Sequence, residues 1–176
     1  AVELAAEAFE ACLAEGWVQD GVLSQSQAQA ANLWQLREGI SESIAGYTPY
    51  KNDLAVRISQ MPDFLDEVDA LVQESYPDFE VCWYGHIGDG NLHLNILKPQ
   101  GLAAEAFFQR CHEISPRIFE RVAFRNGSIS AEHGVGLLKR DFLSYSRSSE
   151  ELAVMEALKQ VLDPGQIMNP GKLLRR

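Results

Sequence analysis

The segment Gly85–Asn95 constrains the fold most, because it carries the signal for its own chain reversal. Asp89-Gly90 is the strongest short-range signal for a β-hairpin with a two-residue loop, since both residues tolerate a positive φ. A reversal there pairs residue 88 with 91, 87 with 92 and 86 with 93. His86 and His93 would then lie directly opposite each other on one face, with Cβ atoms about 5 Å apart.

The two arms of this hairpin, residues 79–87 and 92–97, alternate in polarity as strands with one buried face do. One face would be apolar and would carry Val81, Trp83, Ile87, Leu92, Leu94 and Ile96. The other face would carry Tyr84, His86, His93 and Asn95. We expect helices to cover the apolar face, which leaves the histidine face available for a ligand.

The rest of the chain alternates helical and extended patterns around this hairpin. Helices are expected over residues 2–15, 24–45, 62–75, 102–124 and 148–162, and short strands over 54–58 and 127–131. The central order of strand, helix, strand, strand, helix, strand predicts an α+β, ferredoxin-like fold. This is an antiparallel sheet with helices on one face, here with additional N- and C-terminal helices. At 176 residues, the chain is expected to form a single domain over residues 1–176.

Composition excludes several classes of partner. With 25 acidic residues against 15 basic ones, the formal net charge is −10, which argues against nucleic-acid binding. The three cysteines have no CxxC spacing, which indicates reduced thiols in a cytoplasmic protein. No apolar run approaches the roughly 20 residues of a membrane span. Phosphate-binding loops and the GxSxG motif of serine hydrolases are absent.

Two imidazoles on one sheet face could hold a metal ion. Zinc-type metals take imidazole nitrogens at about 2.0–2.1 Å, and a catalytic site needs a third ligand and an open position. Glu132 is the candidate third ligand, because residues 127–131 can place it beside the hairpin as a further strand. The alternative is that His86 and His93 are half-exposed sheet residues without a ligand.

His133 follows Glu132 directly, and adjacent residues of a strand face opposite ways. Both side chains can serve one site only if the strand ends there, which Gly134 and Gly136 allow. His133 could then act as a general base near the metal. The alternative is a capping or core histidine.

Cations in the first third of the chain could bind a carboxylate. Arg37 and Ser41 are four residues apart on one face of the helix expected over residues 24–45. The planar fork of arginine suits a carboxylate, and Lys51 lies just before the first strand. The alternative for both cations is a solvated surface charge. His112, alone in the middle of a helix, is expected to be structural.

Three motifs follow one another along the chain: Gly85-His86-Ile87-Gly88-Asp89-Gly90-Asn91-Leu92-His93-Leu94-Asn95, Ser130-Ala131-Glu132-His133-Gly134-Val135-Gly136 and Leu162-Asp163-Pro164-Gly165-Gln166-Ile167-Met168-Asn169-Pro170-Gly171-Lys172. They resemble the C-terminal part of the FAD-linked 2-hydroxyacid dehydrogenases, in the vanillyl-alcohol oxidase superfamily. That group contains D-lactate dehydrogenase, the glycolate oxidase flavin subunit and D-2-hydroxyglutarate dehydrogenase. The stretch Leu33-Trp34-Gln35-Leu36-Arg37-Glu38 is most similar to the D-2-hydroxyglutarate dehydrogenase branch.

The resemblance implies a substrate, or cap, domain that works with an N-terminal FAD-binding domain absent from this chain. It implies FAD, bound mainly by that domain, and a divalent metal, usually zinc, held by His86, His93 and Glu132. His133 would take the hydroxyl proton of a D-2-hydroxy acid as hydride leaves C2 for the flavin. The other implied contacts are to substrate from Arg37, Ser41, Lys51 and Asn95, and to the cofactor from Asn169.

Two positions depart from the pattern of that branch. Ser41 stands where threonine is usual, which keeps the hydroxyl but weakens the assignment of a distal carboxylate contact. Arg57 is an additional cation, which either extends the anion site or faces solvent.

The resemblance therefore predicts half of an active site, inactive without the FAD-binding domain. We expect oxidation of a small 2-hydroxy acid to the 2-oxo acid, with electrons passed to a further acceptor. A cytoplasmic location is expected, with membrane contact only through that acceptor, and the face left by the FAD-binding domain could support a homodimer. The alternatives are a binding or assembly module that kept the fold without chemistry, and a metal-dependent hydrolase with the same three ligands.

Overall fold

The computed structural model describes residues 2–174, and the chain divides into two compact units, residues 1–41 and 42–176. The first unit contains α1 (Val2–Ala14) and α2 (Gln27–Glu38). The side chain of Ser26 caps α2 by accepting a hydrogen bond from the backbone N–H of Gln29. The expectation of one helix over residues 24–45 is wrong, because α2 ends at Gly39 and a short α3 (Ile40–Ser43) follows. Glycine inside a helix costs about 1 kcal/mol relative to alanine, which favours this break.

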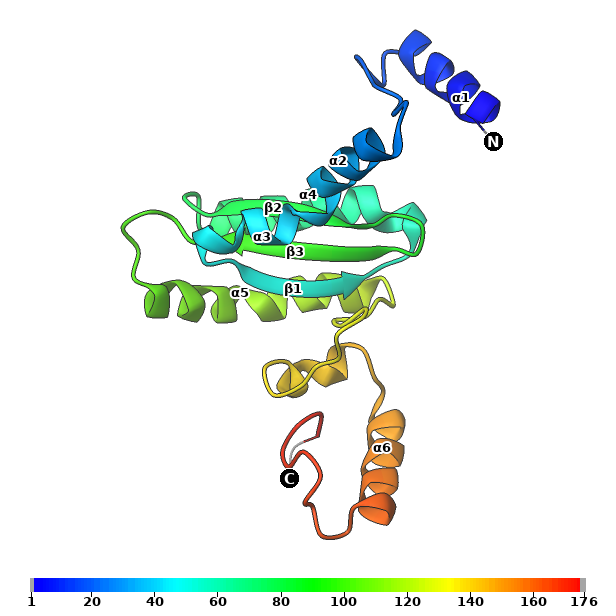
Figure 1. Ribbon diagram of the computed structural model, residues 1–176. Coiled ribbons are helices and arrows are strands. Elements are labelled where there is room, and N and C mark those ends of the chain that lie inside the picture. Colours follow the sequence, from blue (N-terminus) through cyan, green and yellow to red (C-terminus); the bar gives the residue numbers. More distant parts are fainter. Residues whose placement is uncertain (1, 175–176) are drawn as a thin grey trace. The chain divides into compact units, whose positions relative to one another are not determined.

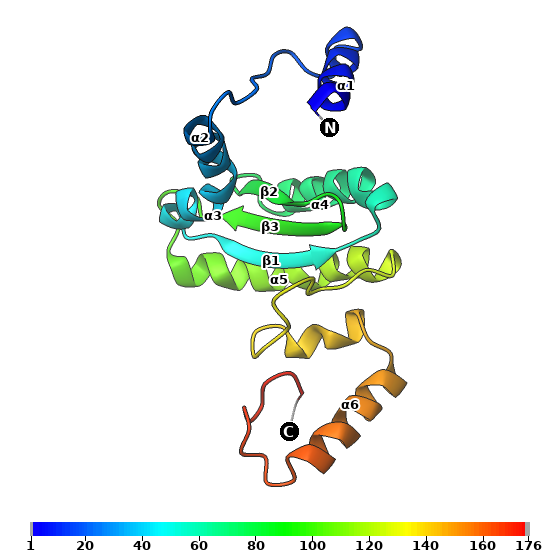
Figure 2. The same cartoon turned by 45° about the vertical axis from the view of Figure 1, so that its right-hand side comes forward.

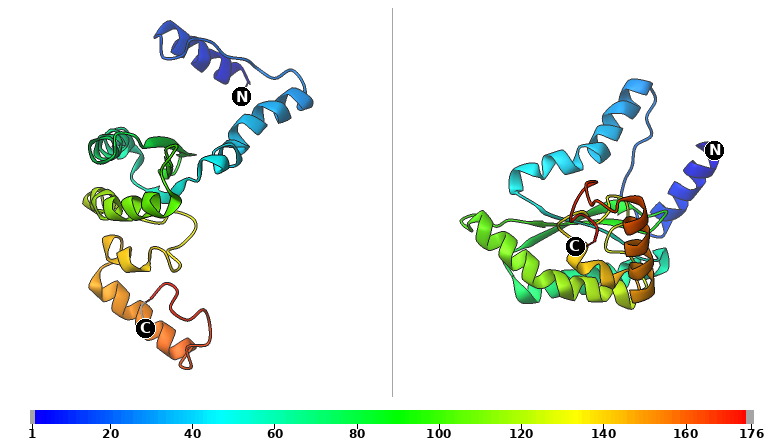
Figure 3. Two further views of the ribbon diagram at one scale, coloured as in Figure 1. Left: turned by 90° about the vertical axis from the view of Figure 1, so that its left-hand side faces the viewer. Right: turned by 90° about the horizontal axis from the view of Figure 1, so that it is seen from below.

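The second unit is built on three antiparallel strands, β1 (Tyr50–Ala55), β2 (Glu80–His86) and β3 (Asn91–Leu97), in the order β1-β3-β2 (Figures 1 and 2). The helices α4 (Met61–Ser75) and α5 (Ala104–Phe124) cover one face of this sheet (Figure 3, left). This arrangement confirms the α+β fold class.

Shorter elements connect and extend this layer. They are the 3₁₀ turns η1 (Ala45–Tyr47), η2 (Ile58–Gln60) and η3 (Arg140–Tyr145) and the C-terminal helix α6 (Ser149–Leu162). Among the described residues, no helix is both long and apolar enough to cross a membrane.

The core lies between the sheet and the two helices beneath it. Apolar residues recur every three or four positions in α4 and α5, so one stripe of each helix faces the sheet. The buried residues include Phe64, Val68, Leu71 and Val72 of α4, Phe107, Cys111, Ile114, Ile118 and Val122 of α5, and Leu54, Leu92, Leu94 and Ile96 of the sheet. The alternation of β3 therefore directs Leu92, Leu94 and Ile96 into the core and its polar residues to the opposite face.

The register of the hairpin differs from the expected one. His93 pairs with Tyr84 and His86 pairs with Asn91, because the turn has four residues, 87–90, instead of two. The side chain of Asp89 accepts a hydrogen bond from the backbone N–H of Asn91, and this local bond stabilises the wider turn. Ile87, expected in the core, is 75% exposed in this turn.

The change of register leaves the histidines on the same face. Side chains alternate with a period of two, and the pairing has moved by two residues, so no side chain changes face. His86 and His93 are diagonal neighbours instead of direct partners, with ring centroids 5.5 Å apart.

Two other strand expectations are wrong in extent. The first strand occupies Tyr50–Ala55 instead of residues 54–58. The fourth strand, expected over residues 127–131, is reduced to an isolated bridge between Ala55 and Ser128. The hydroxyl of Ser128 donates to the carbonyl of Ser130 and accepts from its N–H, and these local bonds compete with a longer ladder. The backbone N–H of Ala131 still donates to the carbonyl of Asp53 at 3.2 Å, so the segment stays beside β1.

Candidate functional site

The sheet face opposite α4 and α5 gathers most of the polar residues that the sequence singled out. Strand pairing places Lys51 opposite Asn95, and Tyr84 opposite His93. His86 lies at the end of β2, next to the turn. Alternation along the strands thus brings residues from three strands to one surface.

Two histidines and one glutamate form a group that could hold a metal ion. One potential ligand atom from each of His86, His93 and Glu132 lies within 4.8 Å of the other two. Nε2 of His86 is 3.3 Å from Oε1 of Glu132. Two imidazoles and a carboxylate are the donor set of many catalytic zinc sites, so the chemistry of these residues fits such an ion.

The carboxylate of Glu132 reaches this group from outside the sheet. Oε1 of Glu132 accepts a hydrogen bond from the side-chain amide of Asn91, the residue opposite His86. Asn91 is a site residue that the sequence reasoning missed, although it shares the alternation of His93 and Asn95. Its own Oδ1 is buried and has no hydrogen-bond partner among the described residues.

Asp53 is the second residue that the sequence reasoning missed. It lies on β1 directly opposite His93 and is only 7% exposed. One carboxylate oxygen accepts hydrogen bonds from the backbone N–H groups of Glu132, at 2.7 Å, and His133, at 3.1 Å. The sequence could have indicated this residue, because Asp53 precedes the core residue Leu54 on the same strand and must therefore point to the opposite, polar face.

His93 belongs to a second group of possible ligands, together with Asp53 and His133. The rings of His93 and His133 have centroids 6.2 Å apart, and the side chain of His133 is 70% exposed. His133 therefore lies at the solvent edge of the histidine cluster, where an incoming molecule can reach its imidazole.

Asn95 lies on the same face but is almost completely buried. Its Nδ2 donates to the backbone carbonyls of His93, at 3.1 Å, and Cys82, at 3.4 Å. Its Oδ1 is buried and has no hydrogen-bond partner among the residues described. The proposed contact of Asn95 with substrate stays a prediction.

A cavity of about 410 Å³ lies at the start of β1, lined by Pro49, Tyr50, Lys51, Phe108, His112, Leu138 and Lys139. His112 packs edge-on against the ring of Tyr50, with centroids 5.6 Å apart. Nζ of Lys139 donates to the carbonyl of Ile129. Burial lowers the pKa of Lys139 to about 8, against the opposing attraction of the Asp53 carboxylate.

The lowered pKa of Lys139 makes stability depend on pH. The folded-state pKa lies below that of an unfolded lysine, about 10.4. At pH values between these two, the unfolded chain therefore binds more protons at residue 139 than the folded chain does. Lys139 by itself should therefore make the free energy of unfolding rise as the pH increases from about 8 to about 10.4, against an opposite contribution from the buried Cys111 thiol, whose pKa is raised to about 12. Lys139→Met should lose this rise, as measured by urea unfolding at several pH values. The exposed neighbour offers the matched variant Leu138→Met, which should keep the rise; a parallel pH dependence in Lys139→Met would contradict the prediction.

Three predicted site residues are not placed at this cluster. Arg37 and Ser41 belong to the first unit, where the guanidinium of Arg37 stacks over the ring of Trp34 at 5.4 Å. Asn169 lies exposed after α6, with a φ of 47°, and its carbonyl accepts from the N–H of Lys172. Their roles stay predictions. Arg57 is exposed in the short extended segment between β1 and η2.

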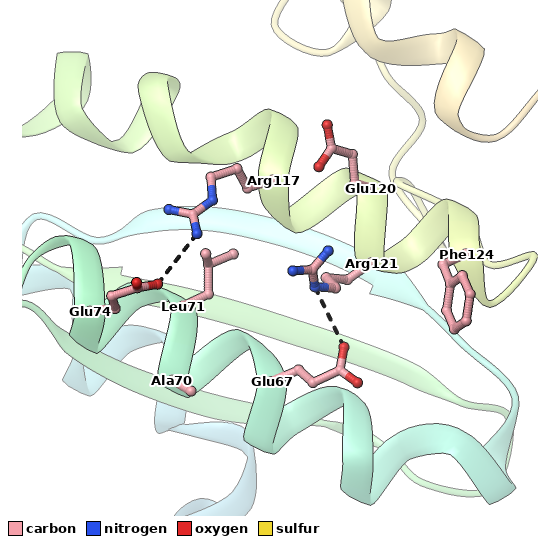
Figure 4. A pocket seen from close by; sticks show the side chains of 8 residues that line it. All are labelled: Glu67, Ala70, Leu71, Glu74, Arg117, Glu120, Arg121 and Phe124. Carbon is pink, nitrogen blue, oxygen red and sulfur yellow. Dashed lines mark hydrogen bonds and ion pairs between the residues drawn. The ribbon is translucent and has the colours of Figure 1, made fainter.

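A groove of about 730 Å³ on the helical side has a different character (Figure 4). It lies between α4 and α5, and its charges pair across it: Arg117 with Glu74, and Arg121 with Glu67. None of its lining residues belongs to the sheet. The histidine cluster is therefore the better candidate for chemistry.

The three cysteines are free, as expected, and Cys111 is buried in the core. Burial raises the pKa of its thiol to about 12, so it remains protonated and unreactive at neutral pH.

Comparison with known proteins agrees with the three sequence motifs. The family described as FAD linked oxidases, C-terminal domain, matches residues 1–173. D-2-hydroxyglutarate dehydrogenase of Stutzerimonas stutzeri is 58% identical over 171 residues, which cover 97% of this chain and 37% of the relative. The protein of the same name from Xanthomonas citri pv. viticola is 56% identical over 166 residues, covering 94% of this chain and 35% of the relative.

More distant relatives do not all share this name: a protein of Schizosaccharomyces pombe, 40% identical over 166 residues, is described as a putative D-lactate dehydrogenase. The mitochondrial D-2-hydroxyglutarate dehydrogenase of Bos taurus is 40% identical over 169 residues, which cover 94% of this chain and 29% of the relative. The chain thus spans about a third of the length of these relatives. The resemblance found in the motifs is confirmed: this chain belongs to the family of FAD-linked oxidase C-terminal domains.

Proposed function

We propose that this chain is the substrate-binding and metal-binding part of an FAD-dependent oxidoreductase that oxidises a D-2-hydroxy acid to the 2-oxo acid. The observation that carries the proposal is the group His86, His93 and Glu132, whose potential ligand atoms lie within 4.8 Å of one another at the sheet face opposite α4 and α5. The names of the similar proteins support D-2-hydroxyglutarate as the substrate.

The residues of the cluster have distinct roles in this proposal. A divalent metal, zinc by its donor set, would polarise the hydroxyl and carboxylate oxygens of the substrate, and the flavin would supply the hydride acceptor. His133, exposed at the edge of the cluster, accepts the hydroxyl proton. Lys51, on the same sheet face, attracts a substrate carboxylate. Arg37 and Ser41 are further proposed substrate contacts, on the resemblance to the family alone.

The rest of the oxidoreductase lies outside the residues of this chain in our proposal. An N-terminal FAD-binding domain makes most of the contacts with FAD. Asn169 of this chain contributes one further contact to the cofactor. Residues 1–176 act together as one domain. An electron acceptor then reoxidises the flavin. A cytoplasmic location, with membrane contact only through that acceptor, and a homodimer are further parts of the proposal.

A chimera tests this function directly. Residues 1–176 would replace the matching third of the Stutzerimonas stutzeri relative, with which they share 58% identity. The chimera should bind FAD and oxidise D-2-hydroxyglutarate faster than D-lactate or glycolate when a dye accepts the electrons. The unmodified relative is the control. A folded, FAD-containing chimera that oxidises none of the three acids would contradict the proposal and favour a non-catalytic module.

A further inference from the structure

The carboxylate of Asp53 makes contacts with two of the three segments that supply the candidate ligands, β3 and the loop that carries Glu132. On the sheet it faces His93: Oδ1 of Asp53 lies 3.5 Å from Nδ1 of His93. On the loop side its Oδ2 accepts the successive backbone N–H groups of Glu132 and His133. The backbone carbonyl of Asp53 also accepts from Ala131. One buried residue thus joins β3 to the loop that follows the β-bridge.

The contact with His93 bears on which ring nitrogen can bind a ligand. Oδ1 of Asp53 is buried and accepts no hydrogen bond from the described residues, so at 3.5 Å it is available as an acceptor for an N–H at Nδ1 of His93. A carboxylate that accepts from one imidazole nitrogen fixes the tautomer and leaves the lone pair on the other nitrogen. For His93 that nitrogen is Nε2.

The contacts with the loop bear on where Glu132 and His133 lie. The strand pairing of this segment stops at Ser128, so no ladder holds residues 132 and 133 in place. Their N–H groups bind a charged acceptor instead, and hydrogen bonds of this kind are about twice as strong as neutral ones. The carboxylate therefore determines the backbone position from which the Glu132 side chain reaches His86.

We propose that Asp53 is a positioning residue, which orients His93 and fixes the Glu132–His133 backbone for metal binding; this inference rests on the proposed function. Asp53 acts through its neighbours and leaves the ligand positions to His86, His93 and Glu132. Residues of this outer kind typically change metal affinity about 10–100-fold when replaced.

The chain offers a matched control at Asp163. This buried aspartate also accepts two successive backbone N–H groups, those of Ile167 and Met168, but it does so after α6. Asp163→Asn therefore reproduces the loss of a buried, backbone-binding carboxylate without changing the histidine cluster.

Zinc titration of the 176-residue chain, with circular dichroism to check folding, compares Asp53→Asn with Asp163→Asn. We expect Asp53→Asn to bind zinc about 10–100-fold more weakly than the unaltered chain, and Asp163→Asn to bind it equally well. An unchanged affinity in Asp53→Asn would overturn the positioning role. A loss as large as that of His93→Ala would also overturn it, because Asp53 would then be a ligand.

A second measurement does not need zinc. Nitrogen-15 spectra of the histidine side chains in the metal-free, unaltered chain should show neutral His93 with its proton on Nδ1. The opposite tautomer would overturn the proposal even if Asp53→Asn failed to fold. If the unaltered chain bound no zinc, the proposed metal role would fail, while this spectrum would still decide whether Asp53 orients His93.

Discussion

Replacing His93 by alanine should abolish most of the zinc binding of this chain and most of the activity of the chimera. His93 is the one residue shared by both groups of possible ligands, with Glu132 and His86 on one side and with Asp53 and His133 on the other. Its loss leaves either group with two ligands. A metal that stabilises charge is worth several kcal/mol, and each 1.36 kcal/mol is tenfold in rate. We therefore expect turnover to fall by about 1,000-fold.

The zinc affinity of His93→Ala should fall by more than the roughly 100-fold upper bound for an outer residue. His112→Ala provides the control, because His112 lies on α5 and packs against Tyr50 on the opposite side of the sheet. Circular dichroism of both variants establishes that they fold. Near-normal turnover in the folded His93→Ala chimera would show that His93 is not part of the active site. Unchanged zinc affinity would show that His93 is not a zinc ligand.

The face of the sheet that carries the histidines could be predicted from the sequence because it depends only on alternation. His86 and His93 share a face under the expected register and under the observed one, since the two differ by an even number of residues. The expected direct opposition of these histidines is wrong, because His93 pairs with Tyr84 and His86 pairs with Asn91. The register could not be predicted from alternation. It depends on the length of the turn, and the hydrogen bond from the N–H of Asn91 to Asp89 selects four turn residues over two.

The roles of Asp53 and Asn91 were harder to predict because each depends on a contact distant in sequence. Asp53 binds the backbone 79 and 80 residues further along, and Asn91 binds Glu132 41 residues further along. The expected fourth strand was to bring Glu132 beside the hairpin. The structure replaces that ladder by one bridge and a carboxylate, a solution that no local pattern indicates.

The break between α2 and α3 is a further feature that the sequence pattern did not reveal. The sequence pattern suggested one helix over residues 24–45, with Arg37 and Ser41 on one face. The break at Gly39 instead places these two residues on α2 and α3. Their spacing on a common helix therefore no longer supports a shared carboxylate site, and only the resemblance to the family does.

Replacing His133 by glutamine should separate proton transfer from metal binding. Glutamine keeps a polar side chain at this exposed position but cannot take a proton at neutral pH. General-base catalysis contributes about 10²–10⁴-fold, so turnover of D-2-hydroxyglutarate by the chimera should fall within that range. Zinc affinity should be unchanged, because His86, His93 and Glu132 form a complete group without His133.

The combination of these two readouts is what makes His133→Gln informative. A fall in turnover with unchanged zinc affinity supports a base at the edge of the cluster, which the 70% exposure of this side chain allows. Zinc affinity that falls as far as in His93→Ala would instead identify His133 as a ligand, and the metal would then belong to the group with Asp53 and His93. Unchanged turnover would exclude His133 as the base, because glutamine cannot accept the hydroxyl proton.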